Sequence, residues 1–481
     1  MKNKAFDAVI VGAGPNGLSA AIALQQAGLN VLLVEAKSTI GGGLRSAALT
    51  LPGFVHDVCS AIHPLAMASP FFKTLPLADY GLQYLQPPVA AAHPFDDGSA
   101  AALFPSLKNT IDTLDAADAG AYRRLLEPVI KDWDMLLPEL LGPLHMPKHP
   151  LAMARFGWPA LRAATTIAKR FKENKARGLW AGMAAHSIQP LTHLTTSAVG
   201  LVLLAAGHTG GWPLPKGGSQ AIAQALVQYF IALGGKVETD FPVHSLNQLP
   251  SSHAVVFDVT PRQLLAITGD RFSGFYKRQL QHFRYGPGVF KIDWALREPI
   301  PFTAAHCRAA GTVHLGNTLE EITAGEQQVW EGRHPDKPFV LLAQQSLFDA
   351  SRVPQGRQAA WAYCHVPHGS QKDMTTAIEN QVERFAPGFK DIILERHVMH
   401  TTQLEAYNPN YIGGDINGGI LDIRQLYTRP ALRLTPYATP AKGIFICSSS
   451  TPPGGGVHGM CGYHAAQAVL KDVFHLSKKS L

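Results

Sequence analysis

The chain has 481 residues, enough for about two domains with a sizeable hydrophobic core. Hydrophobic residues make up 46% of the chain and charged residues only 16%, and the net charge is +7. The positive charge leaves room for an anionic partner. However, no stretch interleaves basic and aromatic residues and no zinc or RNA-binding motif is present, which argues against nucleic acid as that partner.

The first 35 residues contain a strand, a glycine-rich turn, a helix and a second strand. Phe6–Val11 is a nearly all-apolar run, typical of a strand buried on both faces. The turn Gly12-Ala13-Gly14-Pro15-Asn16-Gly17 follows and fits G-x-G-x-x-G. A helix-like stretch from Leu18 to Ala27 leads to a second apolar run, Val31–Val34, which ends at Glu35. This order predicts a Rossmann-type dinucleotide-binding unit.

Each part of this unit has a physical role. Gly12 permits the tight turn, Gly14 lets the backbone approach a pyrophosphate, and Gly17 allows the helix to lie close to the strand. The helix N-terminus offers unpaired amides and a partial positive charge to phosphates, and Glu35 can accept hydrogen bonds from a ribose diol. The residues that we expect to contact the dinucleotide here are Gly12, Gly14, Pro15, Asn16, Gly17, Glu35 and Ala36.

A second glycine-rich segment, Ile40–Ser46, follows. Its three consecutive glycines expose backbone amides to an anion, and Arg45 adds a charge that can reach a phosphate. The next stretch, Ser46–Phe72, is poor in charge, with Asp57 as its only acid. Within it, His63 is a candidate for handling protons beside the cofactor, and a hydrogen-bonded structural histidine is the alternative.

The middle of the chain is also unusually apolar. Gly178–Pro215 contains no Asp, Glu, Lys or Arg, so it forms either core or the wall of an apolar cavity. Its most apolar part, Ser197–Ala206, is too short to span a bilayer. The densest basic run, Arg162–Arg177, is interpreted as a solvated helix face, with peripheral contact to a membrane surface as the alternative.

A second helix–strand block follows this apolar segment. Ser219 is placed to N-cap a helix over Gln220–Leu233, which Gly234-Gly235 ends. Lys236–Val243 is predicted to be extended, and Ala254–Val259 is predicted to be another buried strand.

A third glycine-rich segment lies near the C-terminus. Gly443–Cys447 predicts a buried strand, which runs into the loop Thr451–Gly459 and a helix from Met460 to Val473. The N-terminus of this helix is a second positive dipole end, suited to the negative charge of a reduced flavin. A nicotinamide enzyme needs no such site, so FAD is favoured over NAD. The residues expected at the second and third glycine segments are Gly42, Gly43, Arg45, Gly456, Val457, His458 and Gly459.

These motifs resemble those of the phytoene-desaturase-related NAD(P)/FAD-dependent oxidoreductases, which include carotenoid desaturases and isomerases and are distant relatives of flavin amine oxidases. The resemblance is carried by GAGPNG at 12–17, Glu35, IGGGLRS at 40–46, LPGFVHDVCSAIHP at 51–64 and STPPGGGVHGMCG at 450–462. It implies that the block at 219–259 returns the chain to the FAD domain and that Val243 contacts the adenine.

The expected fold class is α/β, with a Rossmann-type FAD-binding domain of the glutathione-reductase-like, two-dinucleotide-binding-domain kind. The FAD domain is predicted to be discontinuous and an α+β substrate domain to be inserted in it. We assign 1–75, 214–265 and 415–481 to the FAD domain, and 76–213 and 266–414 to the substrate domain.

The predicted function is an FAD-dependent oxidoreductase of the phytoene-dehydrogenase type, which removes a hydride from an apolar substrate held against flavin N5. The alternatives are a flavin isomerase of a polyene or isoprenoid, an amine oxidase, and a scaffold that holds FAD without turnover. The electron acceptor is left open between oxygen, a quinone and NAD(P), and the oligomeric state is also left open. No metal site is expected.

Three residues are candidates for proton transfer. His458 lies in the C-terminal glycine loop, where capping of the helix is the alternative to a role at the flavin. Lys291 alternates with apolar residues and shares a strand face with Asp293, so it is either a pocket base or part of a half-exposed strand. His63 is the third candidate.

The cysteines and the N-terminus bear on location. Cys59, Cys307, Cys364, Cys447 and Cys461 have no paired spacing, which suits a reducing compartment. The chain enters its first strand almost at once, leaving no room for a signal peptide, so a cytoplasmic protein is expected, with membrane association as an addition.

Overall fold

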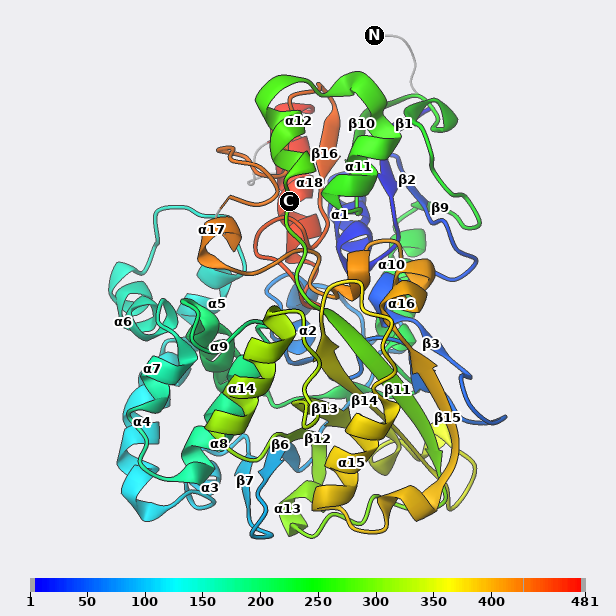
Figure 1. Ribbon diagram of the computed structural model, residues 1–481. Helices are drawn as coiled ribbons and strands as arrows, with labels where there is room; N and C mark the ends of the chain where they lie inside the picture. The colour runs from blue at the N-terminus through cyan, green and yellow to red at the C-terminus, as the bar shows by residue number, and fades with distance from the viewer. Residues whose placement is uncertain (1–4, 427, 477–481) are drawn as a thin grey trace.

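The computed structural model describes residues 5–426 and 428–476, and two β-sheets organise them (Figure 1). The first sheet has five parallel strands in the order β16-β10-β1-β2-β9. Its strands are β1 (Phe6–Val11), β2 (Val31–Val34), β9 (Lys236–Glu238), β10 (Ser252–Phe257) and β16 (Ile444–Ile446). This confirms the α/β Rossmann-type fold that the N-terminal motif predicts.

Helices cover both faces of this sheet, which is why its central strands are continuous apolar runs. On one face lie α1 (Pro15–Gln26), α10 (Gln220–Ala232) and α18 (Met460–Asp472). On the other lie α11 (Pro261–Thr268) and α12 (Gly274–Gln281).

Two predicted details of the helices differ from the structure. Helix α1 begins at Pro15 rather than Leu18, because proline at the first position is already set for helix geometry. Ser219 precedes α10 as predicted, but its side chain caps nothing. Its hydroxyl instead donates to the carbonyl of Ser60, 2.6 Å away.

The second sheet has seven strands in the order β15-β11-β14-β13-β12-β6-β7. All neighbours are antiparallel except β12 and β6. The strands are β6 (Val89–Pro94), β7 (Ala100–Leu103), β11 (Gly288–Leu296), β12 (Ala310–Leu315), β13 (Val340–Ala343), β14 (Gln358–Val366) and β15 (Ile393–Met399). All nine residues of β11 are buried, so the expectation of a half-exposed strand there is wrong.

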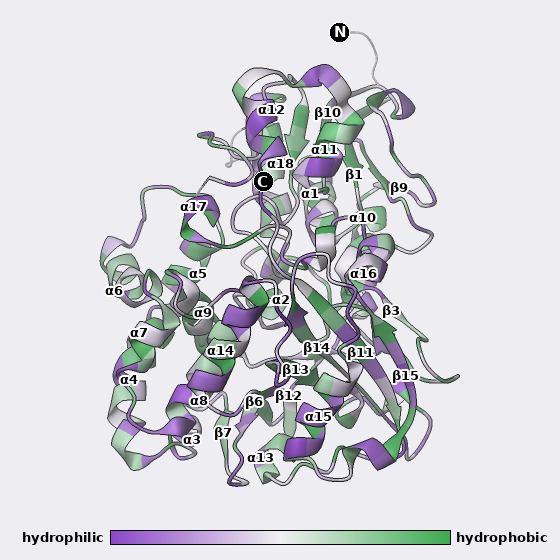
Figure 2. Cartoon of the chain, viewed as in Figure 1, coloured by the Kyte–Doolittle hydropathy of each residue, from purple (hydrophilic) through white to green (hydrophobic). Residues whose placement is uncertain are grey.

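A layer of helices lies beside the second sheet, on the left in Figure 1. Its members are α4 (Ala116–Lys131), α5 (Trp133–Leu140), α6 (Pro150–Ala160), α7 (Ala164–Ala168), α8 (Asn174–Ala185), α9 (Thr196–Gly210) and α14 (Leu319–Trp330). The charge-free segment 178–215 supplies much of α8 and all of α9, which pack against each other. Figure 2 shows purple residues on the outer turns of α14, whereas much of α9 is green.

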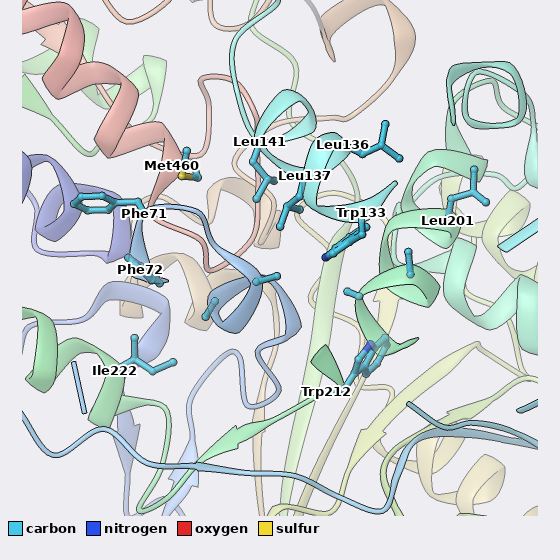
Figure 3. Packing of buried hydrophobic residues seen from close by; sticks show 14 of the residues in the cluster. Phe71, Phe72, Trp133, Leu136, Leu137, Leu141, Leu201, Trp212, Ile222 and Met460 are labelled. Carbon is cyan, nitrogen blue, oxygen red and sulfur yellow. The ribbon is translucent and has the colours of Figure 1, made fainter. Parts of the chain in front are cut away.

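One hydrophobic core joins this helical layer to α1, α10 and α18, the helices on one face of the five-stranded sheet. Figure 3 shows Trp133, Leu137 and Leu141 on one side, and Phe71, Phe72 and Met460 on the other. The two sheets therefore hold a fixed relation to each other, with segments of both available to enclose a site between them.

The remaining elements are short. The two-stranded sheets are β3 (Ser46–Ala47) with β4 (His56–Asp57), and β5 (Tyr84–Leu85) with β8 (Leu214–Pro215). The other helices are α2 (Pro64–Ala68), α3 (Leu107–Ile111), α13 (Ala305–Arg308), α15 (Thr375–Phe385), α16 (Thr401–Tyr407) and α17 (Ile423–Leu426).

The basic run Arg162–Arg177 is not one helix, so the prediction of a single helix face is wrong. Helix α7 holds none of its basic residues, and only Lys175 and Arg177 lie in a helix, at the start of α8. Among residues 5–426 and 428–476, none of the helices combines the length and apolarity that crossing a bilayer requires.

Candidate functional site

A cavity of about 720 Å³ runs between the two sheets, a volume typical of small-molecule sites. One end lies at the carboxyl ends of β1 and β2, where ligands of open parallel sheets bind. That end is lined by Gly12, Gly14, Pro15, Asn16, Glu35, Ala36, Lys37, Phe241, Val243 and Asp258. The cavity then passes Gly42, Gly43, Arg45, Gly456 and Val457, and ends among His63, Leu65, His186, Leu203, Trp212, Thr312, Leu341, Trp361 and Tyr363.

The first glycine loop has the geometry that a dinucleotide needs. Gly12 has a φ of +102°, a conformation that glycine adopts without strain. Gly17 lies behind the loop, where a Cβ would be only 1.9 Å from the carbonyl oxygen of Gly12. It therefore allows α1 to approach β1, as predicted, but it does not line the cavity.

Glu35 and Asn16 present acceptors to the same end. Glu35 accepts the amide of Ala13 at Oε2, 2.9 Å away, and that of Lys37 at Oε1, 3.0 Å away. Each carboxylate oxygen has a second lone pair, so hydroxyl groups of a ribose can still be accepted. The Oδ1 atom of Asn16 is buried with no partner among the described residues. These groups fit the polar end of a dinucleotide.

The second glycine segment forms a single 3₁₀ turn, Gly42–Leu44, against the first loop. Arg45 is nine-tenths buried. Its guanidinium donates from Nε to the carbonyl of Gly42 at 3.0 Å and lies over the Tyr407 ring with 4.2 Å to its centroid. This places a fixed positive charge in the wall of the cavity, beside the glycine amides, where a pyrophosphate would require it.

Asp258 is a residue of the site that the sequence analysis did not predict. It follows β10 directly, and its Oδ2 accepts the amide of Gly17 at the N-terminus of α1, 3.0 Å away. Burial raises the pKa of Asp258 to about 7, and the nearby carboxylate of Glu35 adds to the rise. A neutral carboxyl group therefore stands beside the anion-binding end of α1 below neutral pH.

We expect FAD to bind about tenfold more tightly at pH 6 than at pH 8, because ionised Asp258 repels the phosphates. Because its folded pKa lies above the unfolded value, Asp258 also stabilises the apoprotein below about pH 4, and this stability is lost as pH rises to 7. Asp258→Asn should remove both dependences, measured by FAD titration and by urea unfolding from pH 4 to 8. An unchanged pH dependence of FAD affinity in Asp258→Asn would contradict this assignment.

Most of the residues predicted to contact the cofactor line the cavity, but three of them do not. Those that line the cavity are Gly12, Gly14, Pro15, Asn16, Glu35, Ala36, Gly42, Gly43, Arg45, Val243, Gly456 and Val457. Gly17, His458 and Gly459 do not line it, so direct contact by these three is not supported. Gly459 instead has a φ of +67°, and a Cβ there would lie 2.1 Å from Oγ of Ser19. It allows α18 to lie close to α1.

Two of the three candidate proton-transfer residues lie outside the cavity lining. Nδ1 of His458 accepts the amide of Met460, 3.0 Å away, so this histidine caps α18, as the alternative interpretation has it. Lys291 is buried and forms an ion pair with Asp293, whose carboxylate also faces His56 and His397. The ammonium of Lys291 is satisfied there, so its expected role as a pocket base is not supported.

His63 does line the cavity. Its Nε2 lies 2.7 Å from the hydroxyl of Ser219, which itself donates to Ser60, so Nε2 donates and Nδ1 keeps a lone pair. Nδ1 has no partner among the described residues, and burial lowers the pKa of His63 to about 4. His63 is therefore hydrogen-bonded, as expected of a structural histidine, and it also faces the cavity, as expected of a residue that handles protons.

The far end of the cavity is aromatic and aliphatic. Trp361 and Tyr363 project from the same face of β14, with ring planes 17° apart and centroids 5.6 Å apart. Leu203 and Trp212 come from the charge-free segment 178–215, which therefore supplies both core and cavity wall. The aromatic alternation in Trp361–Tyr363 is the pattern that could have indicated this wall. No group of three or more metal-binding side chains occurs in the part of the chain that the structure describes.

Comparisons with known proteins agree with this geometry. Residues 10–75 match the NAD(P)-binding Rossmann-like domain family. The chain is 25% identical to pyridine nucleotide-disulfide oxidoreductase domain-containing protein 2 of Rattus norvegicus, over 97% of this chain and 94% of that protein. It is 26% identical to hydroxyneurosporene desaturase of Cereibacter sphaeroides, over 98% of each chain. A solved variant of putrescine oxidase shares the fold, with a TM-score of 0.61 at 18% identity over 98% of this chain and 99% of that one.

Motifs, fold and full-length relatives together place the chain among the FAD-dependent oxidoreductases. Within that class, the matches over almost the whole chain confirm the resemblance to the phytoene-desaturase-related family, which the glycine motifs indicated.

Proposed function

We propose that the protein is a dehydrogenase that desaturates an apolar small molecule held beside FAD. The observation that carries this is the distribution of charge along the cavity. The carboxylates and the Lys and Arg side chains that line it, Glu35, Lys37, Arg45 and Asp258, all belong to the glycine-loop end, whereas Leu203, Trp212, Leu341 and Trp361 line the other end. No carboxylate among the lining residues stands there to hold an ammonium group, which disfavours an amine substrate.

The relative named hydroxyneurosporene desaturase supports an isoprenoid-like substrate. FAD, when bound, supplies the acceptor for a hydride. The chain itself supplies the glycine amides and Arg45 for the phosphates, an apolar wall that excludes water, and the lone pair of His63 Nδ1.

We also propose the discontinuous, glutathione-reductase-like domain division. Every strand of the five-stranded sheet comes from 1–75, 214–265 and 415–481, and every strand of the seven-stranded sheet comes from 76–213 and 266–414. One boundary needs correction. Helix α12 packs against the five-stranded sheet, so the second cofactor segment extends beyond residue 265 to at least 281.

Anaerobic reduction of the bound flavin tests the function. Purified holoprotein is mixed with terpenoid, fatty-acyl and amine compounds, and the loss of visible flavin absorbance is recorded. We expect bleaching by terpenoids, followed by reoxidation with oxygen, a quinone or NAD(P) as the acceptor. Bleaching by amines alone would favour an amine oxidase, and no flavin absorbance after reconstitution with excess FAD would contradict the proposal.

A further inference from the structure

Three histidines form a line from the apolar end of the cavity toward the surface. His186, at the C-terminal end of α8, lines the cavity, and its Nε2 lies 2.9 Å from Nε2 of His314 on β12. His93 lies on β6, the parallel neighbour of β12. The Nδ1 atoms of His314 and His93 would lie 2.9 Å and 3.1 Å from a Cβ at Gly182. Both therefore face the same small space above α8.

The hydrogen bonds give this line a direction. Nε2 of His93 lies 2.6 Å from the carbonyl oxygen of Asn317, which can only accept, so Nε2 carries the proton and Nδ1 keeps a lone pair. His314 Nδ1 is then suited to donate toward His93, directly or through one water molecule. In that tautomer His314 accepts at Nε2 from His186, which leaves the lone pair of His186 on Nδ1.

Burial keeps the three rings neutral. It lowers the pKa of His93 to about 4 and that of His314 well below its ordinary value. Burial, together with nearby His365, lowers the pKa of His186 to about 3. The aromatic rings around these histidines are those of Trp212, Phe95 and Phe339. The nearby carboxylates are Glu326, which accepts from His365 at 2.8 Å, and Glu321. The Nδ1 atoms of His93 and His314 have no partner among residues 5–426 and 428–476.

The outer end of the line reaches charged groups at the surface. The half-buried Asn317 donates from its side chain to the exposed carboxylate of Asp96, 2.9 Å away. Arg384 pairs with Asp96 and with Glu321, and the latter carboxylate influences His93. The carbonyl of Asn317 holds the Nε2 proton of His93 but is too weak a base to take it, so release from Nε2 requires a water molecule as the acceptor, and the charges of Glu321 and of Asp96 beyond Asn317 favour a proton there.

We propose that His186 accepts the proton that dehydrogenation releases, and that His314 and His93 pass it to the surface. This inference rests on the proposed function. One C–H bond breaks with its electron pair leaving as hydride to FAD, the oxidant. The adjacent C–H bond breaks with its electrons forming the C=C bond, and its proton goes to Nδ1 of His186. An isomerase, which releases no net proton, would need no such exit.

The first test needs no substrate. In FAD-loaded protein labelled with ¹⁵N-histidine, we expect NMR to show His93 and His186 protonated at Nε2 and His314 at Nδ1. Gly182→Ala inserts a methyl group between the facing Nδ1 atoms and should shift the His314 and His93 resonances. Gly200→Ala, in the neighbouring helix α9 and facing the Trp180 ring at 3.3 Å, is the matched control and should leave them unchanged. His314 protonated at Nε2 would overturn the relay.

The second test is kinetic, with the terpenoid that bleaches the wild-type flavin. We expect His186→Gln to slow flavin reduction about 100-fold at unchanged half-saturation, as loss of a general base does. Gly182→Ala should slow proton release to a pH indicator more than flavin reduction. Wild-type rates in His186→Gln would overturn the proposal. If no compound bleaches the wild-type flavin, the proposed function fails and the tautomers still decide whether the relay exists.

Discussion

Gly17→Ala is expected to lose FAD and to be among the least stable single substitutions in the chain. The added Cβ would lie 1.9 Å from the carbonyl oxygen of Gly12 and 3.3 Å from Cβ of Asp258. The first of these is backbone, so the loop and α1 must separate, at a cost of about 3 kcal/mol or more. The same displacement opens the amides that face the phosphates. Flavin absorbance of the purified protein and its thermal unfolding temperature measure the two effects.

Substitutions at two further glycines distinguish an effect on helix packing from an effect on FAD binding. In Gly462→Ala, the added Cβ on α18 would lie 1.8 Å from the carbonyl oxygen of Asn16, so a comparable loss of stability is expected. Gly157→Ala, on α6, meets nothing within 4 Å and should keep FAD and gain up to about 1 kcal/mol. A Gly17→Ala protein with wild-type flavin content would show that close approach of α1 is not required.

The cofactor loop could be predicted because its determinants are neighbours in sequence. A buried strand, three spaced glycines and an apolar helix lie within 25 residues, and proximity alone brings them together. The error at the start of α1 is also local, since the proline that begins the helix was assigned to the turn.

Asp258 could not be predicted in the same way, because its partner Gly17 is 241 residues distant. Strand Ala254–Val259 was expected to contain it, whereas β10 ends at Phe257 and leaves the carboxyl group at the sheet edge. An isolated acid after a buried strand was the available indication, since the carboxyl ends of parallel strands meet at the ligand site.

Lys291 shows a second limit of prediction from sequence, which concerns burial rather than distance along the chain. Its alternation with apolar residues correctly predicted a strand, and charge on one face suggested exposure to solvent or a pocket. The structure instead buries that face and neutralises the ammonium with Asp293 on the same strand. Sequence periodicity separates the two faces of a strand, but it cannot show that both faces are covered.

Arg352→Met is expected to destabilise the folded protein by about 3–5 kcal/mol at pH 7, because it leaves Asp57 charged, buried and unpaired. Asp57 accepts from Arg352 at 2.7 Å and from the amide of Ser219 at 2.7 Å. Burial raises the pKa of Asp57, but Arg352 and these hydrogen bonds outweigh it and hold the pKa below the ordinary value. Urea unfolding at pH 7 measures the loss.

The pH dependence distinguishes this pair from ordinary packing. Because the folded pKa of Asp57 is depressed, its stabilisation is present above the unfolded value near 4 and is lost as pH falls. The penalty in Arg352→Met should therefore shrink between pH 7 and pH 4, where Asp57 is protonated without its partner. Adding Asp57→Asn should recover much of the loss at pH 7. Arg333→Met, which removes an exposed pair with Glu331, is the control and should leave the stability nearly unchanged at both pH values.

Hydrogen bonds connect the Arg352–Asp57 ion pair to the candidate site. Asp57 holds the amide of Ser219, whose hydroxyl accepts from Nε2 of His63 in the cavity wall. Losing Arg352 should therefore release His63 as well as destabilise the fold. We expect Arg352→Met holoprotein, at a temperature where it is still folded, to reduce its flavin more slowly, whereas Arg333→Met keeps the wild-type rate. A penalty equal at pH 4 and pH 7 would mean that Arg352 contributes through packing alone, and the link from the charge of Asp57 to the cavity would be absent.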